Sequence, residues 1–347
     1  MWRYALFILV CLIAPLLLVE WYARGRYAAY ADDEAFLQLA FERLLNSLVI
    51  PTTNQPHSPP FGYALTPNTS ETIRTDEYTY TIRTNSLGFR TREIAPRDAR
   101  QQQLLIVGDS MLFGVGQDEK HALTGQLERI GTSADTPLRV HNFTMIGFSS
   151  VQALIAAHAV APQLEADYML LGIFLGNDLL PNAISHVGAD GLLAYDEGQI
   201  TRLRAELHRY LAPLMPSLAL RAWALQAWTP RLRYAFSAEE RFLQHTYGLI
   251  DDFVALARAN RARPAIAVIY PRYAVENGLV GRWSMGRKPG QLLAQYCRDQ
   301  DIAVLDLLDY MDGSEDAQRY YYATDGHFNR AGNARVAQAI YDKLIGH

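Results

Sequence analysis

Leu104-Leu105-Ile106-Val107-Gly108-Asp109-Ser110 is the segment that most clearly indicates the fold class of this chain. Its apolar run predicts a buried strand, and Gly108 and Asp109 predict the turn at which that strand gives way to a helix. Ser110 therefore stands just past the end of a strand. In parallel α/β sheets this is the edge at which ligands bind.

The same rhythm continues to the end of the chain, where short apolar runs alternate with amphipathic segments of helical length. This alternation predicts a parallel, doubly wound sheet. The expected strands cover residues 103–108, 138–143, 168–175, 264–270 and 302–307, and the expected helices cover 120–131, 149–161, 246–261, 290–300 and 330–345.

Residues able to carry acyl-transfer chemistry follow these strand ends. Gly147 and Asn177 lie past the second and third strands, and His327 precedes the last helix, with Asp325 beside it. A serine hydroxyl is a weak nucleophile until an imidazole takes its proton and a carboxylate fixes the imidazole tautomer. We therefore expect Ser110, His327 and Asp325 to meet at one edge of the sheet.

Four short blocks in this order resemble the signature blocks of the SGNH, or GDSL-type, hydrolases. They are Gly108-Asp109-Ser110, Gly147 within residues 145–148, Gly176-Asn177-Asp178 and Asp325-Gly326-His327. Each block is weak alone, and their order is the specific signal.

The resemblance implies a flavodoxin-like three-layer α/β/α sandwich with a five-stranded parallel sheet over residues 103–347. It also implies Ser110 as the nucleophile and Asp325 with His327 as the pair that activates it. The oxyanion hole would come from the backbone amides of Ser110 and Gly147 and the side chain of Asn177.

Two departures from the family pattern concern the third and fourth blocks. Leu175 stands where the family places glycine, and Asp325 and His327 are separated by one residue where most members have two. In an extended loop this shorter spacing puts both side chains on the same face. Asp325 then either contacts His327 differently or mainly orients it. The spacing is similar to that of SGNH-like acetyltransferases that modify bacterial polysaccharides.

Each site residue also has a structural explanation. Ser110 is a candidate helix cap, as are Asn177 and Asp178, and Gly147 permits a turn. We expect Asp109 and Asp178 to support the site rather than to react. His141 and His158 are alternative bases, but neither has a carboxylate neighbour as well placed in the sequence as Asp325.

Composition excludes several other functions. A net charge of −4 from 32 basic and 36 acidic residues, without blocks of one sign, gives no footprint for nucleic acid. The nine histidines lack the spacing of zinc sites, so no metal is expected. Residues 114–116 lack the remaining residues of a phosphate-binding or dinucleotide-binding loop, so no cofactor is expected.

The N-terminal segment predicts a membrane anchor. Residues 4–19 carry no charge and are flanked by aromatic residues, which favours a transmembrane helix over residues 1–23 that is not cleaved. A cleaved signal peptide is the second interpretation and a buried helix the third. We expect a single-pass protein of the bacterial inner membrane with its catalytic domain in the periplasm.

Two segments lie outside the minimal sandwich. Residues 24–102 predict a helical stalk near 32–49, a linker at 51–60 and a short β element from Tyr78 to Arg90. Residues 179–245 are a helical insertion with scattered aromatic residues, which predicts either a lid over the site or ordinary packing. The basic segment 282–288 is a candidate for binding an anionic glycan, with a solvated loop as the alternative.

The sequence therefore predicts a membrane-anchored serine esterase that removes O-acyl groups from a cell-surface glycan or a similar acylated substrate. An O-acetyltransferase supplied with acyl groups by a membrane partner is the first alternative. A non-catalytic glycan-binding or scaffolding protein with the same fold is the second.

Overall fold

The computed structural model describes residues 2–45, 57–58, 62–228, 236, 239–275, 287–311 and 317–346. The chain divides into two compact units, one made of residues 1–46 and 196–236 and the other of residues 47–195 and 237–347. These boundaries differ from those expected from the sequence, which follow residues 23 and 102 and set 179–245 apart as one insertion.

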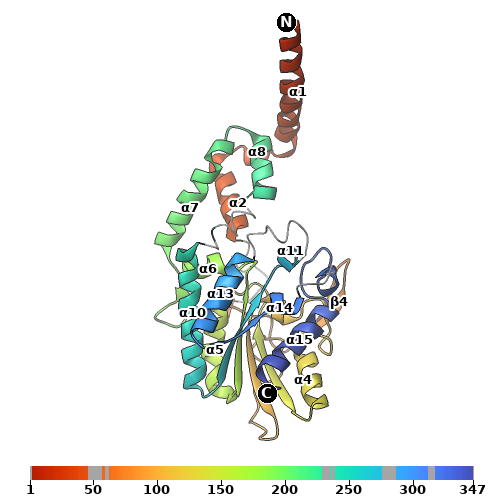
Figure 1. Cartoon of the computed structure of the whole chain (residues 1–347), viewed down its shortest axis with the longest axis vertical. Coiled ribbons are helices and arrows are strands. Elements are labelled where there is room, and N and C mark those ends of the chain that lie inside the picture. Colours follow the sequence, from red (N-terminus) through yellow and green to blue (C-terminus); the bar gives the residue numbers. More distant parts are fainter. Residues whose placement is uncertain are drawn as a thin grey trace. The chain divides into compact units, whose positions relative to one another are not determined.

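A five-stranded parallel sheet forms the centre of the larger unit (Figure 1). Its strands are β5 (Gln102–Gly108), β6 (Leu138–Thr144), β7 (Tyr168–Phe174), β10 (Arg263–Ile269) and β11 (Ala303–Asp306). The spatial order is β6-β5-β7-β10-β11, with Gly108 opposite Thr144 and Val107 opposite Leu171. This is the flavodoxin-like order, and it puts the reversal of strand order beside β5.

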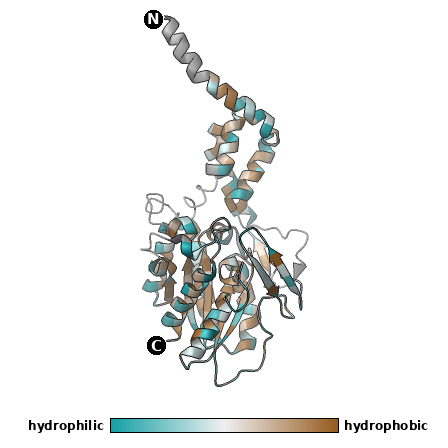
Figure 2. Ribbon diagram, turned by 90° about the vertical axis from the view of Figure 1, so that its right-hand side faces the viewer, coloured by the Kyte–Doolittle hydropathy of each residue, from teal (hydrophilic) through white to brown (hydrophobic). Residues whose placement is uncertain are grey.

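Helices cover both faces of this sheet, so the expected three layers are confirmed. On one face lie α5 (Ser150–Leu164), α10 (Glu240–Ala259) and α13 (Lys288–Asp299), and on the other α4 (Leu123–Ser133) and α15 (Arg330–Leu344). Figure 2 shows apolar residues concentrated in the strands between these layers. Residues 104–107 of β5 are fully buried, as a strand covered on both faces requires.

Shorter elements complete the larger unit. The strands pair as β1 (His57–Ser58) with β2 (Gly62–Tyr63), β3 (Ser70–Arg74) with β4 (Thr79–Arg83), and β8 (Ser185–Val187) with β9 (Leu193–Tyr195). The short helices are α3 (Ser110–Phe113), α6 (Leu179–Ile184), α11 (Arg272–Val275), α14 (Leu307–Met311) and η4 (Ala317–Tyr320). The β element expected from residue 78 onward is β4, and it pairs with residues 70–74, which the sequence did not mark as a strand.

The smaller unit is helical and joins two segments that are far apart in the sequence. It contains α1 (Trp2–Arg26), η1 (Ala28–Tyr30), α2 (Asp33–Leu45), α7 (Glu197–Leu211), η2 (Ala212–Leu214), α8 (Leu218–Trp223) and η3 (Ala224–Trp228). Arg221, only 7% exposed, holds the segments together through the carbonyl oxygens of Tyr30 (2.7 Å) and Ala31 (3.0 Å) and the carboxylate of Asp33 (2.5 Å).

The first helix carries the segment predicted to be a membrane anchor. Among the residues that the structure describes, none of the helices combines the length and the apolar character needed to cross a bilayer. The side chains of residues 1–13, more than half of the predicted span 1–23, lie outside the described part. Of the described side chains, Leu16, Leu17 and Leu18 are between 63% and 69% exposed.

Candidate active site

The turn after β5 presents Ser110 at the start of a helix. Gly108 has φ +152°, and a Cβ there would approach the carbonyl oxygen of Gly172 on the neighbouring strand at 3.2 Å. Asp109 caps α3, because its Oδ1 accepts the backbone N–H of Met111 at 3.0 Å. The cap is thus Asp109, and the explanation of Ser110 as a helix cap is wrong.

Ser110, His327 and Asp325 form a continuous hydrogen-bonded chain. The Nε2 atom of His327 lies 2.8 Å from Oγ of Ser110, and its Nδ1 atom hydrogen-bonds to Oδ1 of Asp325. Ser110 is 7% exposed, and the side chains of His327 and Asp325 are 24% and 27% exposed. This is the arrangement in which an imidazole removes a proton from a serine while a carboxylate holds its other nitrogen.

The short Asp-Gly-His spacing works through a turn, not through an extended loop as expected from the sequence. Gly326 has φ +82°, a left-handed conformation that glycine adopts without strain. The turn lets Oδ1 of Asp325 accept the backbone N–H of His327 at 3.2 Å in addition to the ring Nδ1–H. Asp325 therefore both contacts the imidazole and orients it.

Asp325 is held as a carboxylate. Burial alone would raise its pKa, but the hydrogen bonds from His327 and from the hydroxyl of Tyr78 outweigh burial and hold the pKa at about 2. The Tyr78 hydroxyl donates to Oδ2 at 2.8 Å. The negative charge that stabilises an imidazolium is thus present at neutral pH.

The two further oxyanion candidates lie at the ends of the strands on either side of β5. Gly147, with φ +82°, sits in the turn after β6, and Met145 of that turn donates its N–H to the carbonyl of Gly108 at 3.2 Å. Asn177 follows β7, is 8% exposed, and lowers the pKa of Asp109 through a side-chain hydrogen bond. The turn that contains Gly147 and the side chain of Asn177 are therefore both bonded to the turn that carries Ser110.

Asp109 and Asp178 form a buried carboxyl pair beside this turn. Burial raises the pKa of Asp109 to about 6, against the opposing effects of Met111 and His327. Burial raises the pKa of Asp178 well above its usual value, and the charge of Asp109 raises it further. Asp178 stands at the N-cap position of α6, but its side chain makes no capping hydrogen bond; its Oδ2 accepts the Phe174 N–H at 2.8 Å and the Ser150 hydroxyl at 3.2 Å.

The alternative bases are not near Ser110. His141 is buried in β6, where its Nε2 lies 2.8 Å from Oε1 of Gln103 and burial lowers its pKa to about 4. His158 is exposed on α5. His327 is therefore the base candidate that the geometry supports.

Several residues at the site gave no signal in the sequence. Glu77 and Tyr78, at the tip of the hairpin β3–β4, both bind the loop that carries Asp325. Arg90 is buried beneath the serine helix and donates to the carbonyl oxygens of Phe113 at 3.2 Å and Gly114 at 2.8 Å. Only the alternation of Thr and Tyr near residue 78 marked this region, and it indicated a strand, not a catalytic contact.

The two segments expected to contact substrate, residues 179–245 and 282–288, are described only in part by the structure. Residues 196–236 of the insertion belong to the smaller unit, whereas the triad belongs to the larger one. In that unit Phe236 is buried against Tyr210, and Trp223 is 47% exposed. The side chain of Trp228, residue Tyr234, and residues 282–286 of the basic segment lie outside the described part.

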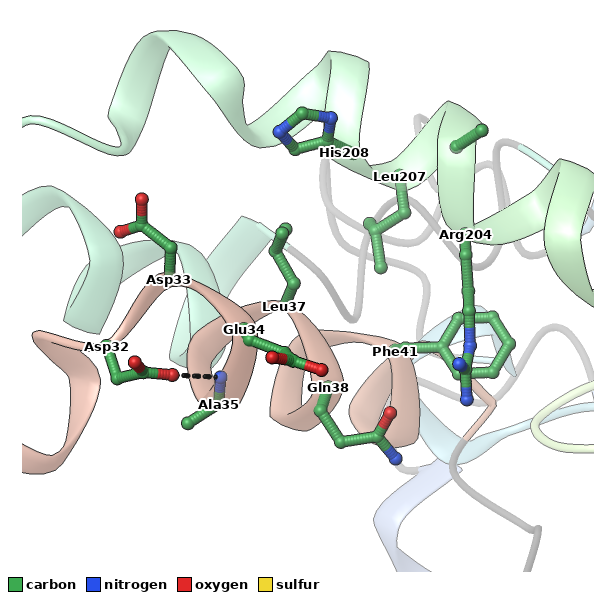
Figure 3. A pocket seen from close by; sticks show the side chains of 11 residues that line it. Asp32, Asp33, Glu34, Ala35, Leu37, Gln38, Phe41, Arg204, Leu207 and His208 are labelled. Carbon is green, nitrogen blue, oxygen red and sulfur yellow. Dashed lines mark hydrogen bonds between the residues drawn. The ribbon is translucent and has the colours of Figure 1, made fainter.

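The smaller unit has a cavity of its own between α2 and α7, of about 790 Å³ (Figure 3). Its lining includes the carboxylates of Asp32, Asp33 and Glu34, and Arg204 packs over the ring of Phe41 at 4.8 Å. No triad residue lines this cavity.

Comparisons with solved structures find similar proteins at low identity. The esterase EstA of Pseudoalteromonas sp. is 16% identical with a TM-score of 0.39, over 70% of this chain and 97% of its own. A lipase from a goat rumen metagenome is 14% identical with a TM-score of 0.44, over 70% and 98%. A GDSL-like lipase of Bacteroides thetaiotaomicron is 14% identical with a TM-score of 0.40, over 72% and 90%.

The structural neighbours also include a lipolytic protein of the G-D-S-L family from Desulfitobacterium hafniense and an SGNH hydrolase from Slackia heliotrinireducens. No protein-family model and no curated protein matches the chain. At this level of likeness, the function must be decided by the geometry of Ser110, His327 and Asp325.

Proposed function

We propose that this protein is a serine-dependent acyl hydrolase of the SGNH type. The observation that carries the proposal is the chain of hydrogen bonds from the Ser110 hydroxyl through His327 to Asp325, with Nε2 and Oγ 2.8 Å apart. Ser110 and His327 are 217 positions apart in the sequence, so it is the fold of the larger unit that brings them together.

The geometry suits a two-step acyl transfer. Nε2 of His327 takes the proton of Ser110 as Oγ bonds to the carbonyl carbon of an ester, and the carbonyl electrons move to its oxygen. The tetrahedral intermediate collapses, the imidazolium gives its proton to the departing alkoxide, and an acyl-enzyme remains. Water, activated by the same imidazole, then releases the acid. Asp325 stabilises the imidazolium in both steps.

The oxyanion would be bound by the backbone amides of Ser110 and Gly147 and the side-chain amide of Asn177. Hydrogen-bond donors that are in place before the reaction usually give the largest stabilisation of the transition state, because they need not reorganise as charge develops. Support comes from their positions at the ends of β5, β6 and β7, adjacent strands of one sheet.

For substrate we propose O-acyl groups on a cell-surface glycan, with the chain anchored by residues 1–23 and the larger unit outside the cytoplasm. This part rests on the uncharged, apolar residues 4–19 of the sequence. A reporter fused after His347 is expected to be active in the periplasm; activity in the cytoplasm contradicts the localisation.

Transfer to a sugar hydroxyl is the second candidate reaction, because the Asp-Gly-His spacing at residues 325–327 is similar to that of SGNH-like acetyltransferases. Both reactions share the acyl-enzyme, and the acceptor of the second step separates them.

The test assays the full-length chain with two acetyl donors, a chromogenic acetyl ester and an acetylated glycan. Each reaction is run with and without a glycan acceptor. Release of acetate that is lost in Ser110→Ala supports the hydrolase. Acetylated glycan as the main product would assign the transferase. No turnover and no transfer by folded protein rejects both reactions and favours the non-catalytic alternative.

A further inference from the structure

We infer that Tyr78 is a positioning residue of the catalytic triad. It lies at the tip of the hairpin β3–β4, where its side chain and that of the adjacent Glu77 bind the loop that carries Asp325. The inference rests on the proposed function and deepens it, since it assigns a fourth member to the same site. Nothing in the four motif blocks includes residues 70–83, which precede the first block.

The contact of Tyr78 with Asp325 is direct. Its hydroxyl donates to Oδ2 of Asp325 at 2.8 Å, while Oδ1 of the same carboxylate is engaged by His327. Each carboxylate oxygen thus has its own donor, and the plane of the carboxylate is fixed by both. A carboxylate held on one side only is free to rotate away from the imidazole.

The tyrosine is itself held in place. Its ring packs against that of Tyr322 with centroids 4.7 Å apart and against that of Tyr80 at 5.6 Å. Tyr322 donates its backbone N–H to the carbonyl of His327 at 2.9 Å, so the same residue supports the ring of Tyr78 and the backbone of the catalytic histidine.

Glu77 provides the second attachment. Its carboxylate oxygens accept the backbone N–H groups of Thr324 at 2.9 Å and Asp325 at 2.7 Å. The hairpin tip itself is closed by the N–H of Thr75, which donates to the carbonyl of Tyr78 at 2.9 Å. The tip therefore fixes both the backbone and the side chain of the triad acid.

The chemistry explains why the donor is a phenol. Burial and Asp325 raise the pKa of Tyr78, so the hydroxyl stays protonated and remains a donor. A neutral donor orients the carboxylate without cancelling the charge that must stabilise the imidazolium. Because the Asp-Gly-His turn has a flexible glycine at its centre, hydrogen bonds from Tyr78 and Glu77 are needed to fix the orientation of Asp325.

The first test compares Tyr78→Phe with a matched control. The phenylalanine keeps the ring packing and removes only the donor; we expect kcat for the chromogenic ester to fall about 10-fold with KM within twofold, as for an orienting group lost from the transition state. Tyr296→Phe is the control, because Tyr296 also hydrogen-bonds a carboxylate, Asp251, at 2.8 Å and stacks on Tyr247 at 4.1 Å. Its kcat is expected to stay within twofold of wild type.

A double-mutant cycle shows whether Tyr78 acts through Asp325. In the Asp325→Asn background, adding Tyr78→Phe is expected to change kcat by less than twofold. The amount of active enzyme in each variant is counted by labelling Ser110 with a fluorophosphonate, so a merely misfolded fraction is not mistaken for a slower site.

The outcomes are separable. An unchanged kcat in Tyr78→Phe, a loss of equal size in the Asp325→Asn background, or a loss explained by fewer labelled sites overturns the role of Tyr78 and leaves the hydrolase intact. A wild-type chain that neither hydrolyses esters nor labels at Ser110 overturns the proposed function and this inference with it.

Discussion

The contribution of Asp109 to the stability of the folded protein depends on pH. Asp109 caps α3 from a fully buried position beside Asp178, and burial raises its pKa to about 6. The folded protein therefore binds a proton that the unfolded chain has already lost above its usual pKa near 4. The associated stability is fully present below about pH 4 and is lost as pH rises through about 6.

Asp109→Asn removes this titration while keeping a side chain that can cap α3. We expect the variant to gain stability relative to wild type as pH rises from 4 to 7, by on the order of 2 kcal/mol. Thermal melts of both proteins across this range measure the difference. Parallel curves for the two proteins would show that Asp109 does not titrate in this window.

Asn177→Ala tests the oxyanion assignment at the same scale. Loss of one preorganised donor typically lowers kcat by about 10²–10³ and leaves ground-state binding nearly unchanged. Steady-state kinetics with the chromogenic ester separate kcat from KM. A variant whose KM rises while kcat holds would place Asn177 in substrate binding instead.

Residue chemistry was readable from the sequence where it depended on motif order. Ser110, His327 and Asp325 were predicted because each stands next to a recognisable strand end or helix start. Tyr78 and Glu77 were not, because their contacts with Asp325 span about 250 positions and no local pattern encodes such a contact.

At the scale of elements, the turn at Gly326 decides whether the triad acid and base meet. A Cβ at this position has nothing within 4 Å, so alanine costs only the strain of φ +82°. Gly191, at the turn between β8 and β9, has φ +77° and is equally open.

Gly326→Ala and Gly191→Ala are therefore expected to lose about 1 kcal/mol of stability each. Only Gly326→Ala is expected to lose activity, at least 10-fold, because a small displacement of Asp325 from His327 weakens the relay. Melting temperatures and kcat for both variants make the comparison. Equal activities would mean that the turn conformation is unimportant for the site.

The strands of the sheet were predicted within two residues at each end, because fully buried strands appear as continuous apolar runs. The sequence predicts a β element from residue 78 onward but not its partner strand in the hairpin β3–β4. The partner strand, Ser70–Arg74, is largely exposed and carries one apolar residue, Ile73, so it has no hydrophobic alternation to detect. Helix α10 begins at Glu240, six residues before its expected start.

At the scale of the whole molecule, the grouping of residues 1–46 with 196–236 had no sequence signal. It depends on contacts such as those of Arg221 in α8, whose guanidinium reaches the carbonyl oxygens of Tyr30 and Ala31 across about 190 positions. Sequence patterns report which residues are buried, but not which distant segment buries them.

Arg221→Met tests this division. The substitution removes the donors to the part-buried carbonyl oxygens of Tyr30 and Ala31, and we expect it to destabilise the smaller unit by about 1–2 kcal/mol. Because the triad belongs to the larger unit, turnover of a small ester should stay within twofold. Calorimetry should show the smaller unit melting earlier, whereas Arg202→Met, on the exposed side of α7, should leave it unchanged. A single transition shifted together with activity would contradict the division.

The proposed function requires Ser110 to be a nucleophile activated by His327. The most direct measurement is to treat the full-length chain with a fluorophosphonate and locate the adduct by mass spectrometry. We predict one adduct, on Ser110, that is absent from His327→Ala. Folded protein that stays unlabelled, or that carries its adduct on another residue, would contradict the account.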